Sequence, residues 1–265
     1  MSDEGRSRRQ YLTTVGGTAA TLAVAGCLGG DDSGSNGEDE QTITAGTAPG
    51  FPPFEMKEGG ELVGFDIDLL EAVVEQTEYT LSGWEEFEFD SLTPALVNDN
   101  IDVIAAGMTI NDDRDETIDF SEPYYSSDQA IVVRSDGDFS PGSLSDLADH
   151  PIGAQKGTTG EEEVQSELVG DEITESQYNA YDNYVLAIQD LQNGNVDAVV
   201  IDVPVANTFA ANRPVEVEFV YETGEKFGFG VREDDDALQT ALSEGLSTVR
   251  EDGTYEELTQ KWFGE

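Results

Sequence analysis

Cysteine and histidine are almost absent from this chain of 265 residues, which contains one of each, Cys27 and His150. A disulfide within the chain and a thiolate metal cluster both need more than one cysteine, so both are excluded. His150 lies in the sequence LADHPIGA, with no nucleophile motif near it, and we interpret it as a surface-loop residue. We therefore expect no catalytic triad, no metal and no other cofactor.

Basic residues are also scarce, because 12 Lys and Arg stand against 57 Asp and Glu, and the formal net charge is -45. Such a chain repels the phosphate backbone of nucleic acids, so we exclude nucleic acid as a partner. The acidic runs lack the spacing of an EF-hand loop, and we interpret them as solvated surface. In about 1 M salt the Debye length is roughly 3 Å, which screens such a surface, so we expect a halophilic source.

The sequence has no apolar run long enough to cross a membrane as a helix. An uncharged stretch, residues 13–26, follows the twin arginines of SRRQYL and leads into VAGC. Its length and position are typical of a targeting segment. It resembles a twin-arginine export signal with a lipoprotein box, which implies a signal peptide over residues 1–27 and a lipid on Cys27. Residues 28–41, rich in Gly, Ser and acids, would form a flexible tether.

From residue 42 onward the chain alternates short apolar runs with amphipathic ones. The apolar runs predict strands at TITAG, DVIAAG, AIVV, PIGA, DAVVI and FGFGV. Helices are predicted at DIDLLEAVVEQTE, SLTPALVND and DNYVLAIQDLQNG, and over residues 237–252 and 255–263. The alternation indicates an α/β fold with a mostly parallel sheet covered on both faces.

Four of these strands are followed by unusual segments, namely GTAPGFPPFE, GMTINDDR, QKGTTG and Asp202. Ligands of open α/β sheets bind outside the carboxyl ends of the strands, so we expect these segments to converge on one crevice. Arg114 offers a planar fork that grips a carboxylate, and the amides and hydroxyls of residues 157–160 suit the same anion. Asp202 can accept a hydrogen bond from an ammonium group and supply the opposite charge. The site chemistry therefore fits a free amino acid.

Ordinary packing is the alternative for several of these side chains. Phe51, Phe54 and Phe89 can wall a ligand crevice, or they can belong to a hydrophobic core. Arg114 can instead form an exposed ion pair with a neighbouring acid, which contributes under about 1 kcal/mol. The residues alone leave both interpretations open.

A set of motifs follows one order along the chain: FPPFE, GFDIDL, DVIAAGMTI with a following arginine, FSEPYY, GTTG, DAVVID and DGTYEELTQKWFG. From about residue 42 to residue 263 this pattern resembles the family 3 extracellular solute-binding proteins, which deliver polar amino acids to ABC importers. The resemblance implies a two-lobed, hinge-closing periplasmic-binding fold of type II. It also implies a ligand-binding set: Phe51, Phe89, Gly107, Thr109, Arg114, Thr158, Thr159 and Asp202.

The resemblance gives each end of a bound amino acid its own partners. Arg114, with Thr109 and Thr159, would hold the ligand carboxylate. The carbonyl oxygen of Gly107 and the carboxylate of Asp202 would hold the ammonium. The two phenylalanines of the set would sandwich the ligand.

The resemblance also sets the lobes and the expected function. Residues 42–129 and 224–265 would form lobe 1 and residues 130–223 lobe 2, with crossings near Asp128 and near residues 222–226 that act as a hinge. We expect a monomeric binding protein, lipid-anchored on the extracellular face of the cell membrane, that captures an amino acid and delivers it to an ABC permease. We expect no enzymatic activity.

Two other functions stay open at the sequence level. An enzyme of the cyclohexadienyl dehydratase type resembles these binding proteins in fold and would need a carboxyl acid over its substrate, for which Glu55 or Glu122 is available. The other alternative is a ligand sensor of a signalling complex.

The type of ligand side chain is suggested by one departure from the family. Many relatives that bind cationic or amide side chains carry an acid two residues after the first-strand glycine, where this chain has Ala48. A buried ammonium or guanidinium would lack its partner there. We therefore expect a preference for neutral or small side chains over lysine and arginine.

Overall fold

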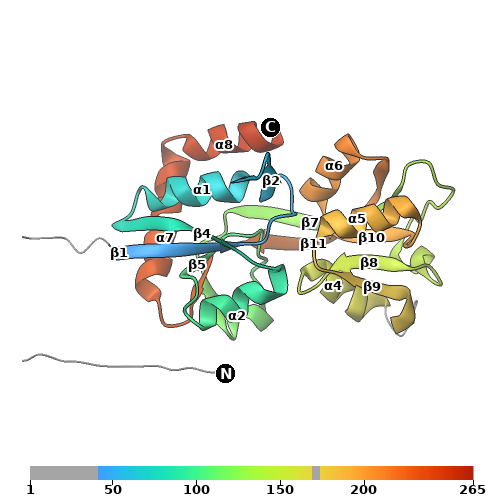
Figure 1. The fold of residues 1–265 in the computed structure, drawn as a ribbon, viewed down its shortest axis with the longest axis horizontal. Coiled ribbons are helices and arrows are strands. Elements are labelled where there is room, and N and C mark those ends of the chain that lie inside the picture. Colours follow the sequence, from blue (N-terminus) through green and yellow to red (C-terminus); the bar gives the residue numbers. More distant parts are fainter. Residues whose placement is uncertain (1–40, 169–173, 265) are drawn as a thin grey trace, which may run out of the picture. The chain divides into compact units, whose positions relative to one another are not determined.

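The computed structural model describes residues 41–168 and 174–264 of the chain. The predicted signal peptide, Cys27 and nearly all of the predicted tether lie outside these residues. Within them the chain forms two five-stranded sheets, each with helices packed against it, so this part of the protein has a two-lobed α/β fold (Figure 1). Both sheets are mixed, whereas the alternation of elements predicts a mostly parallel sheet.

The sheet of the first lobe has the strand order β4, β1, β5, β12, β6. Its strands are β1 (Gln41–Thr47), β4 (Tyr79–Glu86), β5 (Val103–Ile104), β6 (Ile118–Phe120) and β12 (Gly230–Arg232). β1 runs parallel to β4 and β5, whereas β12 is antiparallel to β5 and β6. A small hairpin of β2 (Met56–Glu58) and β3 (Glu61–Val63) follows β1.

Helices lie on both sides of this sheet (Figure 1). α1 (Phe65–Val74), α7 (Asp236–Glu251) and α8 (Thr254–Phe263) pack against one another. The shorter α2 (Leu92–Val97) contacts β1 and β5, and α3 (Asp112–Asp115) contacts β6. α1 forms where the sequence predicts it, because Phe65, Leu69 and Val73 recur at helical spacing and are all buried.

The second lobe contains the sheet with the order β11, β7, β10, β8, β9. Its strands are β7 (Tyr125–Arg134), β8 (Ile152–Gln155), β9 (Tyr178–Tyr181), β10 (Ala198–Asp202) and β11 (Val215–Phe227). β8 is parallel to β9 and β10, whereas β7 is antiparallel to β10 and β11. Its helices are α4 (Thr159–Glu163), α5 (Tyr184–Asn193) and α6 (Val203–Asn212).

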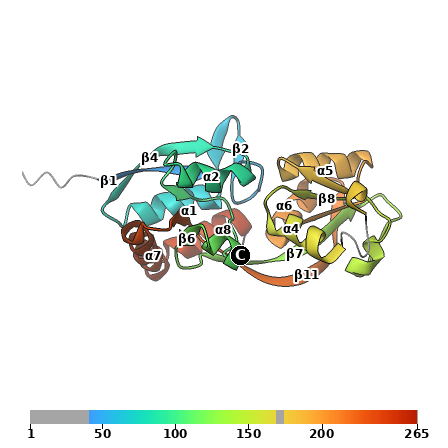
Figure 2. The same ribbon diagram turned by 90° about the horizontal axis from the view of Figure 1, so that it is seen from below.

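Two strands of this second sheet, β7 and β11, continue into the first lobe (Figure 2). They pair antiparallel from Arg134 opposite Val215 to Tyr125 opposite Phe227. At the end of the pair, Phe227 also bridges to Thr109 of the first lobe. Two adjacent strands that join two lobes are the usual construction of a hinge.

Candidate functional site

A pocket lies between the two lobes and is lined by residues of both. Its lining contains the eight positions of the expected ligand-binding set: Phe51, Phe89, Gly107, Thr109, Arg114, Thr158, Thr159 and Asp202. It also contains Ala48, Glu55, Ala106 and Gln155. The four segments that follow strands in the sequence therefore meet at this pocket.

Arg114 lies in α3 and lines the pocket. The side chain of Asn111 caps this short helix by accepting a hydrogen bond from Arg114 N at 2.9 Å. Arg114 Nη1 donates to the carbonyl oxygen of Thr109 at 2.7 Å, and Nη2 donates to that of Gly157 at 2.8 Å. The guanidinium carbon also lies 5.5 Å from the centre of the Phe89 ring. The guanidinium is therefore directed at the pocket and its backbone rim, which disfavours the alternative of an exposed ion pair.

Hydrogen bonds across the pocket connect the two lobes. The bond from Arg114 to Gly157 is one of them, and Thr159 Oγ1 donates to Thr109 Oγ1 at 3.0 Å in another. Burial lowers the pKa of Arg114, and the negative charge of nearby carboxylates counteracts this shift. Because a guanidinium in a protein stays protonated, Arg114 brings a permanent positive charge to the pocket.

The GTTG segment turns the chain from β8 into α4. Gly157 has a φ of 73°, a left-handed conformation that glycine adopts without strain. Thr158 caps α4 by accepting from Glu161 N at 3.3 Å, and its hydroxyl donates to the carbonyl oxygen of Gln155 at 2.7 Å. The hydroxyl of Thr158 thus holds the turn, whereas that of Thr159 reaches across the pocket.

Asp202 ends β10 and is 4% exposed. Its Oδ1 atom has no hydrogen-bond partner among the described residues. Burial raises the pKa of Asp202 well above its usual range, Glu225 raises it further, and hydrogen bonds from Ser127 and Gln129 oppose the change. A buried acceptor without a partner is costly, so a ligand ammonium that reached Asp202 would supply both a donor and the opposite charge.

Glu55 lines the pocket, although the sequence indicates it only as a possible acid of the rival enzyme and not as a contact of an amino-acid ligand. It is 0% exposed, and neither Oε1 nor Oε2 has a hydrogen-bond partner among the described residues. Burial raises the pKa of Glu55 well above its usual range, and the charges of Asp66 and Asp202 raise it further. The pocket therefore holds a second carboxyl group that lacks a cation or a donor.

Gly107 brings the backbone of the pocket lining close to the ring of Phe51. It has a φ of 56°, and a Cβ atom placed on it would lie 2.5 Å from Cε1 of Phe51. Its amide donates to Asp66 Oδ2 at 2.7 Å, and the hydroxyl of Tyr124 donates to the same oxygen at 2.6 Å. Asp66 thus fixes the Gly107 backbone next to the Phe51 ring.

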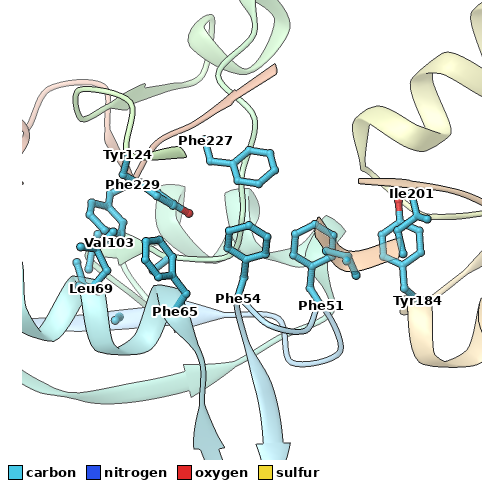
Figure 3. Close-up of a cluster of buried hydrophobic side chains, with 14 of the residues drawn as sticks. Phe51, Phe54, Phe65, Leu69, Val103, Tyr124, Tyr184, Ile201, Phe227 and Phe229 are labelled. Carbon is cyan, nitrogen blue, oxygen red and sulfur yellow. The ribbon is translucent and has the colours of Figure 1, made fainter. Parts of the chain in front are cut away.

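Phe51 and Phe54 have different roles, although both belong to the FPPFE motif. Phe51 lines the pocket, and its ring centre lies 5.8 Å from that of Tyr184 in the second lobe. Phe54 is fully buried among the aromatic residues of the first lobe, including Phe65 (Figure 3). Core packing is therefore the correct interpretation of Phe54, whereas Phe51 and Phe89 line the pocket.

No group of His, Cys, Asp and Glu side chains in residues 41–168 and 174–264 is arranged to hold a metal ion. None of the helices in that part of the chain is long and apolar enough to span a membrane. Cys27, the predicted lipid attachment residue, lies outside the described residues.

Comparison with known proteins gives consistent matches. Residues 43–265 match the family model described as "Bacterial extracellular solute-binding proteins, family 3". The chain is 31% identical to "ABC transporter arginine-binding protein 1" of Escherichia coli K12, covering 91% of this chain and 98% of that protein. It is 32% identical to a "Probable histidine-binding protein" of Campylobacter jejuni, covering 83% of this chain and 84% of that protein.

Solved structures give the same result. The fold matches "An ancestral arginine-binding protein bound to arginine" with a TM-score of 0.79 and 37% identity, covering 84% of this chain and 99% of that one. These relatives are binding proteins, so the expectation of a binding protein rather than an enzyme is confirmed. The two-lobed periplasmic-binding fold is confirmed as well. This chain belongs to family 3 of the bacterial extracellular solute-binding proteins.

Proposed function

We propose that this protein captures a cationic amino acid, with arginine as the first candidate and histidine as the second, and delivers it to an ABC importer. The observation that carries the choice of a cation is Glu55, a fully buried carboxyl group in the pocket with no partner for either oxygen. The relatives described as arginine-binding and histidine-binding proteins support the same choice. This proposal reverses the preference for neutral side chains expected from Ala48, because the carboxyl group of Glu55, whose pKa is raised by burial, would supply the missing negative charge when it releases its proton beside a bound cation.

The pocket offers separate partners for the three polar parts of such a ligand. Arg114 would bind the carboxylate as a charge-assisted pair, exchanging one of its two backbone contacts for the ligand, with Thr159 beside it. Asp202 and the carbonyl oxygen of Gly107 would bind the ammonium. Glu55 would face the cationic end of the side chain.

The aromatic walls favour the same class of ligand. Phe51 and Phe89 are both nearly buried and line the pocket. A planar guanidinium or imidazolium gains further stabilisation against an aromatic face. Their low polarity also strengthens the contacts of the ligand with Glu55 and Arg114.

The remaining expectations complete the proposed function. Residues 42–129 with 224–265 and residues 130–223 would act as the two closing lobes, with β7 and β11 as the hinge. Export through a twin-arginine signal and a lipid on Cys27 would hold the protein at the outer face of the cell membrane. The net charge of -45 supports a halophilic source, since molar salt would screen that charge.

The test replaces two acidic residues one at a time and measures arginine affinity in molar salt by titration calorimetry. Replacing a buried partner of a charged ligand typically costs about 2 to 5 kcal/mol, so Glu55→Gln should weaken arginine binding by roughly 30-fold or more. The matched control is Glu122→Gln, which removes the same charge from an exposed residue outside the pocket lining. Glutamine binding should be much less affected by Glu55→Gln. Arginine affinity that is equal in both variants would refute the role of Glu55.

A further inference from the structure

We propose that Glu225, on hinge strand β11, is a positioning residue that fixes the direction of the Thr109 hydroxyl and makes it a hydrogen-bond acceptor toward the ligand. Glu225 is 6% exposed and is not among the residues that line the ligand pocket, whereas Thr109 is. Glu225 therefore acts on binding through its hydrogen bond with Thr109 and through its charge, which also reaches Asp202 and Arg114. This inference rests on the proposed function, because it concerns the same ligand pocket.

Both carboxylate oxygens of Glu225 accept hydrogen bonds. Thr109 Oγ1 donates to Oε2 at 2.7 Å. Gln129 Nε2 donates to Oε1 at 2.8 Å, and Thr223 Oγ1 donates to the same atom at 2.7 Å. Three side chains, from the first lobe and from both hinge strands, thus meet on one buried carboxylate.

This arrangement decides what the Thr109 hydroxyl can offer. A hydroxyl has one hydrogen, and that of Thr109 is used on Glu225. Thr109 Oγ1 then has only lone pairs to offer, and one of these accepts the hydroxyl of Thr159. An acceptor suits a ligand ammonium and not a ligand carboxylate. The geometry therefore assigns Thr109 to the ammonium end, beside Asp202, rather than to the carboxylate end that the family resemblance implies.

The hinge holds Glu225 in place on its own strand. Glu225 pairs with Ser127 of β7, directly after a shift in the register of the two strands. Within that shift the amides of Thr223 and Gly224 donate to Asp128 Oδ1, at 3.0 and 2.8 Å. Because these hydrogen bonds hold the two hinge strands together here, Glu225 presents Oε2 to Thr109 from a fixed position.

The substitution Glu225→Gln tests the direction of the hydrogen bond. Gln129 and Thr223 both donate to Oε1, so an amide at position 225 would keep its oxygen there and place its NH₂ against Thr109. The Thr109 hydroxyl would then accept from the amide and turn its hydrogen toward the pocket. Arginine binding should weaken roughly 10- to 100-fold, the range expected for a lost hydrogen bond to a charged group.

The experiment is a double-mutant cycle of Glu225→Gln and Thr109→Val, with calorimetric titration of arginine and of 5-guanidinopentanoate, which lacks the α-ammonium. We expect Glu225→Gln to weaken arginine binding in the wild-type background and to have little further effect in Thr109→Val. The affinity for 5-guanidinopentanoate should not fall. Thr223→Val, which removes a different donor to Glu225, is the control for general disturbance of the hinge.

The outcomes separate this inference from the proposed function. Wild-type protein that binds none of the twenty amino acids would overturn both. If the wild type binds arginine but the effects of Glu225→Gln and Thr109→Val are additive, the role of Glu225 alone is overturned. The same holds if Glu225→Gln weakens the binding of arginine and of 5-guanidinopentanoate equally. If Glu225→Gln does not fold, Thr109→Ser and Thr109→Val decide the question. Thr109→Ser should bind arginine as tightly as the wild type does. Thr109→Val should bind arginine more weakly and 5-guanidinopentanoate as tightly as the wild type does. Equal losses of affinity for both ligands in Thr109→Val would refute the assignment.

Discussion

Replacing the buried Asp66 by Asn should change the pH dependence of stability. Burial raises the pKa of Asp66 from 3.8 to about 6, and hydrogen bonds from Tyr124 and Gly107 lower it by less. Between about pH 4 and pH 6 the folded protein therefore holds a proton at Asp66 that the unfolded chain has lost. The free energy of unfolding then falls as the pH rises through this range, and two pKa units correspond to about 3 kcal/mol.

The variant Asp66→Asn removes this titration and keeps one oxygen to accept from Tyr124 and Gly107. Relative to the wild type, the variant should gain about 3 kcal/mol of stability between about pH 4 and pH 7. Urea unfolding at both pH values in fixed molar salt measures the difference, and Glu75→Gln, exposed at the end of α1, controls for the loss of one negative charge. The same stability difference at both pH values would refute the reasoning.

Three other predictions concern the pocket and the surface. Arg114→Ala should weaken arginine binding by about 2 to 5 kcal/mol in calorimetry while circular dichroism shows an intact fold, and unchanged affinity would contradict its role. Gly107→Ala should lower both the melting temperature and the arginine affinity, because its Cβ would lie 2.5 Å from the Phe51 ring at a φ of 56°. The melting temperature of the wild type should fall steadily from molar to millimolar salt, and a flat profile would argue against the halophilic interpretation.

Much of the first-order architecture can be predicted from the sequence. α1, α5, α7 and α8 lie within one or a few residues of the predicted helical segments, and α5 ends at Gly194, which has a φ of 76°. These elements have strong periodic patterns or clear ends. The apolar runs also locate β1, β5, β8 and β10, because a strand buried inside a sheet needs little besides apolar side chains.

The edge strands are harder to predict. β4 and β11 lie at the edges of their sheets, and their sequences, YTLSGWEE and VEVEFVYETGEKF, are rich in charged or polar residues. The alternating start of β11 is the signal that could have identified it. β7 follows β6 with no helix between them, so its antiparallel pairing with β10 and β11, which makes the second sheet mixed, does not follow from the alternation of elements either.

Some residues in and beside the pocket can be predicted from the sequence, and others cannot. Arg114 and Asp202 can be predicted because each follows an apolar strand, where a ligand crevice is expected. Glu225 cannot, and the sequence offers Glu55 only as a possible acid of the rival enzyme. The importance of both depends on burial and on neighbours far away in the sequence, such as Asp202 for Glu55 and Thr109 for Glu225. An acid directly after the apolar FPPF segment is the only local signal for Glu55.

The most direct test of the central claim, that the pocket binds a cationic amino acid, is titration of the wild-type protein with arginine in molar salt by calorimetry. We predict saturable binding to one site, with arginine or histidine bound more tightly than glutamine. Glutamine or another neutral amino acid as the tightest ligand, or no binding of arginine and histidine, would contradict the account.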